Sequence, residues 1–287
     1  MSNELTTIET LSPTEIMKLI GQSQSSGPNL AKVDINKMPQ DPEGNDLPVG
    51  AWKVWYQPLN EAVYGKKMLF RPIIQVYQYL VYDEKIKDYT NKTINFTNWS
   101  DQIPDERGTF KCGKISKKEF EVAPQAVKDE QRRIKCKRHL YGLVSLDGKT
   151  GKGQKVSIEE YPCKWSTSGK SFVPLGEVLE GLAKQKKIMF NHFLSVGLKM
   201  EVNGNNVYYV PVSEVTDKQV TFNSENQKDL EHLTFFRELI AAENSEIMNK
   251  WRTATSKIPT VIEAKAVQDV EFSEADLNDE LPESMKG

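Results

Sequence analysis

The chain of 287 residues has only three cysteines and three histidines, so it is poor in the side chains that build disulfide frameworks and many catalytic sites. An odd number of widely spaced cysteines argues against disulfides. No GxxxxGK[ST], GxGxxG, HExxH or GxSxG motif is present, so the common signatures of phosphate-binding, metalloprotease and hydrolase sites are missing. We therefore expect no catalytic residues, no cofactor and no enzymatic activity.

Long apolar segments are also missing. No run reaches the length that crosses a bilayer, and the first ten residues, MSNELTTIET, do not have the basic and then apolar pattern of a secretion signal. These absences predict a cytoplasmic protein without a membrane partner, belonging to a cell or to a virus-infected bacterial cell.

A zinc site is one alternative for the few cysteines. Cys112, Cys136, His139 and Cys163 are the right kinds and number of ligands for a closed tetrahedral site. However, Cys136 and His139 are three residues apart, and on an extended strand such residues point to opposite faces. A bulge or turn could bring them together. Our expectation is three reduced thiols, an ordinary histidine and no metal.

Charge is distributed unevenly, although the formal net charge is only −2. Residues 51–170 contain 23 Lys and Arg against 14 Asp and Glu. Residues 1–50 contain 3 against 7, and residues 263–287 contain 2 against 8. A basic middle between acidic ends is compatible with a nucleic-acid binder, because the acids are kept apart from the basic segment.

The most informative segment is 47–83, where aromatic and basic residues alternate. It contains eight aromatic residues, Trp52, Trp55, Tyr56, Tyr64, Phe70, Tyr77, Tyr79 and Tyr82, among the cations Lys53, Lys66, Lys67 and Arg71. Its second half has the period of a strand. Rings and cations on one sheet suit single-stranded nucleic acid, since bases stack on rings and phosphates meet cations. The alternative is that the rings fill a β-sheet core while the lysines extend to water.

A second basic segment lies at 107–138, where eleven cations fall within 32 residues that contain four acids. The cations are Arg107, Lys111, Lys114, Lys117, Lys118, Lys128, Arg132, Arg133, Lys135, Lys137 and Arg138. The strand that follows continues with Lys137, His139 and Tyr141. Such a run is either a solvated face or part of a groove that follows a phosphate backbone.

The pattern along the chain predicts three parts: an N-terminal arm and linker (1–46), a β-rich core with helices (47–257) and a disordered acidic C-terminal tail (258–287). Within the core, residues around Asn203-Gly204 have the signal of a hairpin turn, and residues 225–253 carry the broad apolar stripe of a long helix. We expect an α+β fold with a mainly β core, an OB-like Greek-key barrel or sandwich with helical insertions and a long C-terminal helix.

In this layout the chain resembles the replication single-stranded-DNA-binding proteins of double-stranded DNA phages. The resemblance lies in the aromatic and lysine-rich core at about 47–215 and in the acidic end, DVEFSEADLNDELPESMKG. The tail ends in Met285-Lys286-Gly287, whereas phage binders of this type often end in an aromatic residue. The resemblance implies an OB-type fold and sequence-tolerant binding of single strands in DNA replication, recombination or repair, without catalysis.

We therefore predict a single-stranded-DNA-binding protein that coats single strands and recruits partner proteins through its acidic tail. Homo-oligomerisation is left open. The predicted stacking residues are Trp52, Trp55, Tyr77, Tyr79 and Tyr141. The predicted phosphate-binding residues are Lys53, Lys66, Lys67, Arg71, Lys111, Lys114, Arg132, Arg133, Lys137 and Arg138. The alternatives are a non-catalytic viral structural or assembly protein and a subunit of a nucleic-acid-processing enzyme.

Overall fold

The computed structural model describes residues 30–204, 206–221 and 227–256, and within them the strands form one nine-stranded sheet. The strands are β1 (Ala31–Ile35), β2 (Trp52–Tyr56), β3 (Glu61–Gly65), β4 (Met68–Asp83), β5 (Asp88–Lys92), β6 (Ile134–Thr150), β7 (Lys155–Thr167), β8 (His192–Asn203) and β9 (Asn206–Gln219). The α-helices are α2 (Lys117–Val122), α3 (Gln125–Arg132), α4 (Phe172–Lys184) and α5 (Gln227–Thr255). Short 3-10 turns are η2 (Gln57–Leu59), η3 (Lys111–Gly113), η4 (Gly169–Ser171) and η5 (Met189–Asn191).

Five of these strands are linked in a ring of pairings. β1 pairs with β2, β2 with β3, β3 with β6 and β6 with β7, all antiparallel, and β7 pairs in parallel with β1. Gly148 makes the β3–β6 approach possible, because a Cβ there would lie 2.3 Å from the backbone oxygen of Tyr64. The remaining strands extend the sheet from β6 through β4 to β5 on one branch and to β8 and β9 on the other.

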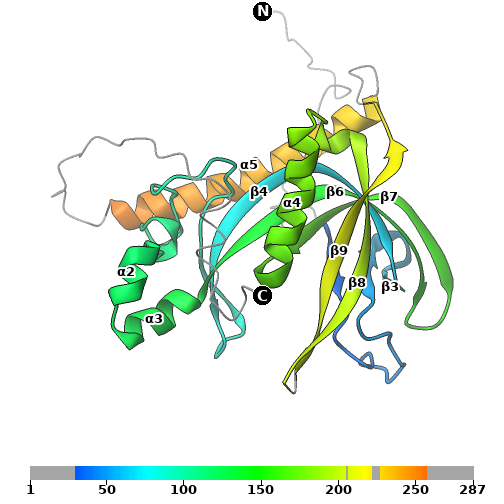
Figure 1. Cartoon of the computed structure of the whole chain (residues 1–287), viewed down its shortest axis with the longest axis horizontal. Coiled ribbons are helices and arrows are strands. Elements are labelled where there is room, and N and C mark those ends of the chain that lie inside the picture. The colour runs from blue at the N-terminus through cyan, green and yellow to red at the C-terminus, as the bar shows by residue number, and fades with distance from the viewer. Residues whose placement is uncertain (1–29, 205, 222–226, 257–287) are drawn as a thin grey trace, which may run out of the picture. The chain divides into compact units, whose positions relative to one another are not determined.

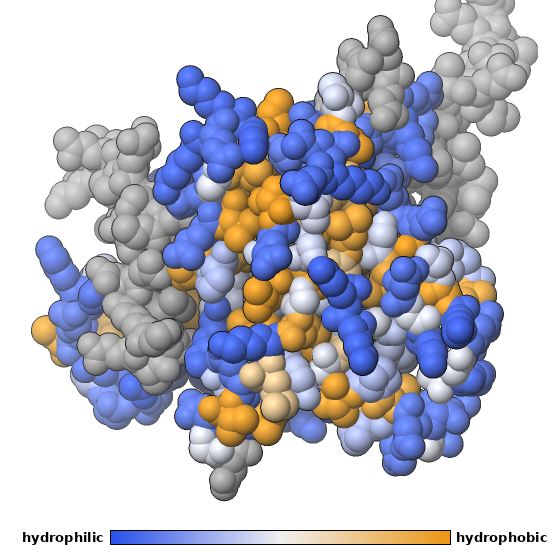
Figure 2. Space-filling view, turned by 45° about the vertical axis from the view of Figure 1, so that its right-hand side comes forward, coloured by the Kyte–Doolittle hydropathy of each residue, from blue (hydrophilic) through white to orange (hydrophobic). Residues whose placement is uncertain are grey.

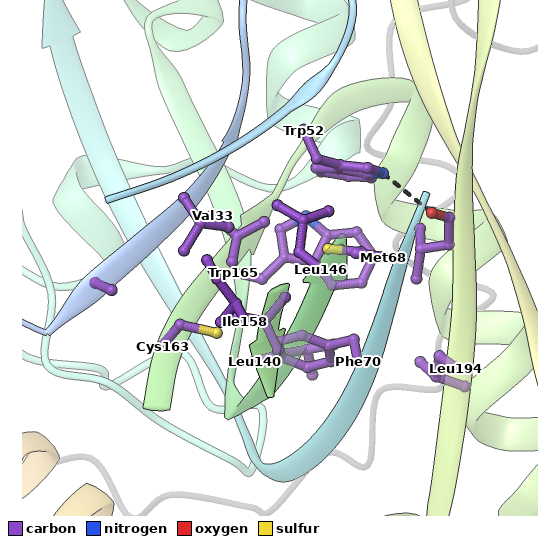
Figure 3. Packing of buried hydrophobic residues seen from close by; sticks show 14 of the residues in the cluster. Val33, Trp52, Met68, Phe70, Leu140, Leu146, Ile158, Cys163, Trp165 and Leu194 are labelled. Atoms are coloured by element: carbon purple, nitrogen blue, oxygen red, sulfur yellow. Dashed lines mark hydrogen bonds between the residues drawn. The ribbon is translucent and has the colours of Figure 1, made fainter. Parts of the chain in front are cut away.

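The main core lies on the inner face of this ring. Trp52 and Trp165 pack edge to face with ring centroids 5.6 Å apart, and Phe70 packs on Trp165 at 5.4 Å. The Trp52 indole Nε1 donates a hydrogen bond to the backbone oxygen of Val196 on β8 at 3.0 Å (Figure 3). This bond pairs the one polar atom of a fully buried ring, as burial of tryptophan requires.

A second, aromatic cluster continues the same face of the sheet along β4. Tyr77 and Tyr79 lie against Phe96, and Phe172 at the start of α4 closes the cluster. Helix α4 also sends Leu175 and other apolar side chains into the main core. Helix α4 therefore covers the inner face of the sheet.

Helix α5 covers the opposite, outer face, where it crosses β4 and β6 (Figure 1). Phe236 and Ile247 of α5 have no exposed surface. Arg71 of β4 makes two hydrogen bonds of 2.7 Å to the carboxylate of Asp229, and both side chains are buried. The Asn95 backbone N–H donates to the Asn244 side chain at 2.6 Å. The helix is thus fixed to the sheet at its start and along its length.

The prediction of a mainly β fold with helices and a long C-terminal helix is confirmed, as is the hairpin turn at Asn203-Gly204. Strand β4 departs from regular pairing at Pro72. There β4 has a bulge, because proline cannot donate to the β-ladder. One difference concerns the predicted arm, whose residues 31–35 form β1 within the sheet. Ala31 and Val33 face the core, a period-2 pattern too short to stand out among the turn-forming residues around it. Residues 1–29 and the predicted tail, 258–287, lie outside the described residues.

Among the described helices, none is both long and apolar enough to cross a bilayer. Figure 2 shows one side of the molecule, where apolar surface occurs in small patches separated by hydrophilic side chains.

Candidate nucleic-acid interface

Four lysines from strands β1, β7, β6 and β5 share the outer face of the sheet, and β4 lies between β6 and β5. Lys32 of β1 is the register partner of Lys164 of β7, and Lys164 is the partner of Tyr141 of β6. Lys137 lies two alternations before Tyr141 on β6, and therefore on the same face. Lys92 of β5 is the register partner of Leu80 of β4, and Leu80 is in turn the partner of Lys135 of β6. We call Lys32, Lys92, Lys137 and Lys164 the lysine strip.

An exposed aromatic ring lies at each end of the strip. Tyr89 of β5 is 41% exposed, its ring lies 4.8 Å from Lys137 Nζ, and its hydroxyl is hydrogen-bonded to the same amine. Tyr82 packs edge to face on Tyr89 at 5.4 Å. At the other end, the antiparallel register Val33↔Val54, carried one residue further, places Trp55 opposite Lys32. Trp55 is 45% exposed. The strip and its rings cross six adjacent strands, about 24 Å at ~4.8 Å per strand.

The lysines are close enough to affect one another's ionisation. Burial lowers the pKa of Lys164, Glu243 of α5 opposes this shift, and Lys32, Lys92 and Lys137 add to it. Burial also lowers the pKa of His139 well below its usual value, with Lys164 and Lys137 acting in the same direction. A neutral His139 fits its place between Ser166 Oγ at 2.7 Å and Gln78 Oε1 at 3.3 Å. Clustered cations of this kind favour an anionic ligand, which relieves their repulsion.

Helix α5 borders the strip through Glu243. Its carboxylate lies 3.6 Å from Lys92 Nζ and 3.9 Å from Lys164 Nζ. It also accepts hydrogen bonds from Asn95 Nδ2 at 3.0 Å and Gln78 Nε2 at 3.3 Å. Burial opposes ionisation of Glu243, but Lys164, Asn95 and Lys92 outweigh it and lower the pKa of this carboxyl.

Four of the five predicted stacking residues are buried, and only Trp55 is exposed. Trp52 has no exposed surface, and Tyr77 and Tyr79 are 4% and 2% exposed on the inner face. Tyr141 is 3% exposed on the outer face, where it lies beneath Lys164 and against Phe236 of α5. The four buried rings contribute to packing and offer no surface to a base in this conformation.

The predicted phosphate-binding residues are spread over several parts of the protein. Arg71 is held by Asp229, and Arg138 is buried between the rings of Tyr77 and Phe172. Lys53 lies on the outer face of β2, as the register partner of Asp34 of β1. The others lie at the β3–β4 turn (Lys66, Lys67), around η3 (Lys111, Lys114) and at the end of α3 (Arg132, Arg133). Among the predicted cations, only Lys137 belongs to the lysine strip.

The cysteines and His139 are not brought together. Cys136 belongs to the inner aromatic cluster, whereas His139 lies on the outer face. Cys163 is in the main core, and Cys112 contacts the backbone oxygen of Tyr79. Burial raises the pKa of both Cys112 and Cys163, which favours their thiol forms. In the described part of the chain, no group of three His, Cys, Asp or Glu side chains is placed to hold a metal ion.

Sequence reasoning missed Lys32, Lys92, Lys164 and Tyr89. Lys32 was assigned to the arm, and Lys164 stood alone among apolar strand residues. A signal was present, since each lysine is flanked by buried residues, Ala31 and Val33 in one case and Cys163 and Trp165 in the other. A cation between two core positions must point to the other face of its strand.

The lysine strip provides four cations across the outer face of the sheet, with an exposed aromatic ring at each end. Such a surface suits a flexible polyanion that carries flat groups. No family model matches the chain, and no curated protein or solved structure was found to be similar to it.

Proposed function

We propose that the protein binds single-stranded DNA on the lysine strip without strong sequence preference. The observation that carries this proposal is the row of four lysines between the exposed rings of Trp55 and Tyr89 on one face of the sheet. The lysine amines bind phosphates, and the rings stack on unpaired bases, which every base offers. A duplex keeps its bases stacked inside, so it can use the cations but not the rings.

The ring of pairings through β1, β2, β3, β6 and β7 supports the further proposal of a small barrel of the OB-like kind. Such barrels carry oligonucleotides on the outer surface of their strands. In this proposal the acidic tail recruits partner proteins during DNA replication, recombination or repair, as the resemblance to phage single-strand binders implies.

The test replaces Lys32 and Lys137 by Gln in the full chain. These two amines are the members of the strip that do not lie beside Glu243. Binding is measured by fluorescence anisotropy with a labelled oligothymidine of about thirty nucleotides, longer than the ~4–16 that one binding fold covers, and with a duplex of equal length. The double variant should lower single-strand affinity and make its salt dependence shallower by about two units of slope, one for each lost phosphate contact.

The matched control replaces Lys186 and Lys187 by Gln, which removes two exposed lysines from the loop after α4. It should leave the affinity and the salt slope nearly unchanged. If the parent chain binds neither oligonucleotide at low salt, the proposal is wrong. Equal losses in the control and the double variant would assign binding to general charge and not to the strip.

A further inference from the structure

Glu243 lies where the lysine strip offers its densest set of hydrogen-bond donors. The donors come from four places on the sheet side: Lys92 on β5, Lys164 on β7, Gln78 on β4 and Asn95 after β5. Two are amide N–H groups that donate hydrogen bonds to the Glu243 carboxylate, and two are ammonium groups that lie at ion-pair distance from it. Ammonium and amide donors are also the groups that proteins use to bind backbone phosphates.

The position suits a phosphate for a geometric reason. A carboxylate and a phosphodiester each present two anionic oxygens to donors, so donors arranged for one fit the other. In addition, the site lies within the strip, since Lys92 and Lys164 are two of its four lysines. A DNA strand that runs along the lysine strip from Lys137 to Lys32 must pass Lys164, which lies between them.

The carboxylate can leave without unfolding α5. The Glu243 side chain is 26% exposed, so rotation about its own bonds can carry it towards solvent. The helix remains fixed by other contacts, namely the fully buried Phe236 and Ile247 and the ion pair between Arg71 and Asp229. The contacts that hold the helix are therefore separate from those that occupy the strip.

We infer that the donors around Glu243 form a phosphate-binding position of the lysine strip, and that the Glu243 carboxylate occupies it until single-stranded DNA displaces it. This inference rests on the proposed function and adds an intramolecular competitor to it. In the empty protein the single negative charge of Glu243 offsets one of the two positive charges of Lys92 and Lys164, and this lowers the affinity for any polyanion. Single-stranded DNA that displaces the carboxylate contacts both lysines, but its binding free energy is reduced by the contacts that Glu243 loses.

The test compares Glu243→Gln with Glu246→Gln in the full chain. Glu246 is on the same helix one turn further on, where it pairs with Lys250, so its replacement removes the same charge outside the strip. Glu243→Gln should tighten binding of the labelled oligothymidine about two- to fivefold, the range that partly exposed ion pairs are worth. Its salt slope should change by less than about one unit, because displacement of the carboxylate leaves the same phosphate contacts in the complexes of both chains. Glu246→Gln should leave the affinity closer to that of the parent chain, because Glu246 pairs with Lys250 and acts on Lys92 only through space.

Lys164→Gln, measured in two backgrounds, provides an independent check. In the parent chain Glu243 already neutralises this lysine, so its loss should weaken binding less than Lys137→Gln does. In the Glu243→Gln background the loss should be larger and should remove the gained affinity. Thermal unfolding of each variant shows whether α5 stays docked.

The possible failures are distinct. If the parent chain binds no single strand, the proposed function fails. If the parent chain binds, but Glu243→Gln melts normally and binds no more tightly than Glu246→Gln, Glu243 is only a docking residue and the inference is overturned. Equal effects of Lys164→Gln in both backgrounds would overturn it as well, even if Glu243→Gln proved unstable.

Discussion

The two faces of the sheet around strands β4 and β6 both carry basic residues next to aromatic rings. These pairs are buried on the inner face and reach solvent on the outer face. On the inner face, Tyr77 and Tyr79 are buried, and the guanidinium of Arg138 lies 5.2 Å from the ring of Tyr77. On the outer face, Lys137 lies 4.8 Å from the ring of Tyr89, and both reach solvent. Each face has cations on rings, but only the outer face exposes them to solvent.

The comparison shows that a ring beside a cation in the sequence does not by itself make a nucleic-acid interface. What differs is the covering layer. The inner face is closed by α4 and by the loop that carries Phe96, whereas α5 leaves the strip partly open. A cation–ring pair that is closed over stabilises the fold, and an open pair is available to bind.

The largest expected effect concerns a cation that the outer face does bury. Arg71→Met removes the guanidinium that makes two hydrogen bonds to the buried Asp229 carboxylate, and this should lower the free energy of unfolding by about 3–5 kcal/mol. Chemical denaturation monitored by circular dichroism measures the loss. A small loss of stability would mean that the docking of α5 does not depend on this ion pair. The separation between the contacts that dock the helix and those in the lysine strip would then be wrong.

Two further variants complete that measurement. Arg71→Met combined with Asp229→Leu should recover much of the stability, because the buried carboxylate is removed together with the guanidinium. Arg133→Ala removes an exposed pair with Asp83 and should leave the free energy of unfolding nearly unchanged.

A smaller effect, on binding and not on stability, separates the rings of the two faces. Tyr89→Ala should weaken oligothymidine binding by about 1–3 kcal/mol, about fivefold to 150-fold, because a stacked base loses its ring. Tyr89→Phe keeps the ring and should retain most of the affinity. Trp52→Phe alters a core ring and should lower the melting temperature while the affinity is unchanged. A loss of affinity in Trp52→Phe alone would assign stacking to the inner face.

Much of the fold could be predicted from the sequence because its signals are local. The hairpin at Asn203-Gly204, the long helix and the irregularity at Pro72 each depend on residues close together in the chain. The ring of pairings could not be predicted, since it depends on contacts such as β1 with β7, which are more than a hundred residues apart. A short strand gains its stability from those partners and not from its own pattern.

The candidate site was predicted only in part for the same reason. Alternation placed Tyr77 and Gln78 on opposite faces, but it did not say which face α5 covers. The face that α5 covers depends on Asp229 and Glu243, which contact β4 from a helix far along the chain. Lys137 and Trp55 were found because they lie in segments rich in rings and cations. Lys164 joins them through the pairing of β7 with β6, and Lys32 joins them through the parallel pairing of β1 with β7.

The smallest expected effect is a pH dependence of the free energy of unfolding. It arises at His139, whose side chain points to the outer side of the sheet and is buried there. Burial, with Lys164 and Lys137 nearby, lowers its pKa in the folded state, whereas the unfolded chain titrates near its ordinary value of about 6.5. As the pH falls below that value, the unfolded state takes up the proton first, so stability decreases, by up to about 1.4 kcal/mol per pH unit until the folded-state pKa is reached. His192 and His232 also have lowered pKa values, so the informative quantity is the difference between the parent chain and His139→Gln. Denaturation at pH 7 and pH 5 should show a smaller decrease for the variant. If the free energy of unfolding decreases equally in both chains, His139 takes up its proton in the folded protein at its ordinary pKa. The outer face would then be open to solvent at this residue, although the structure has it buried.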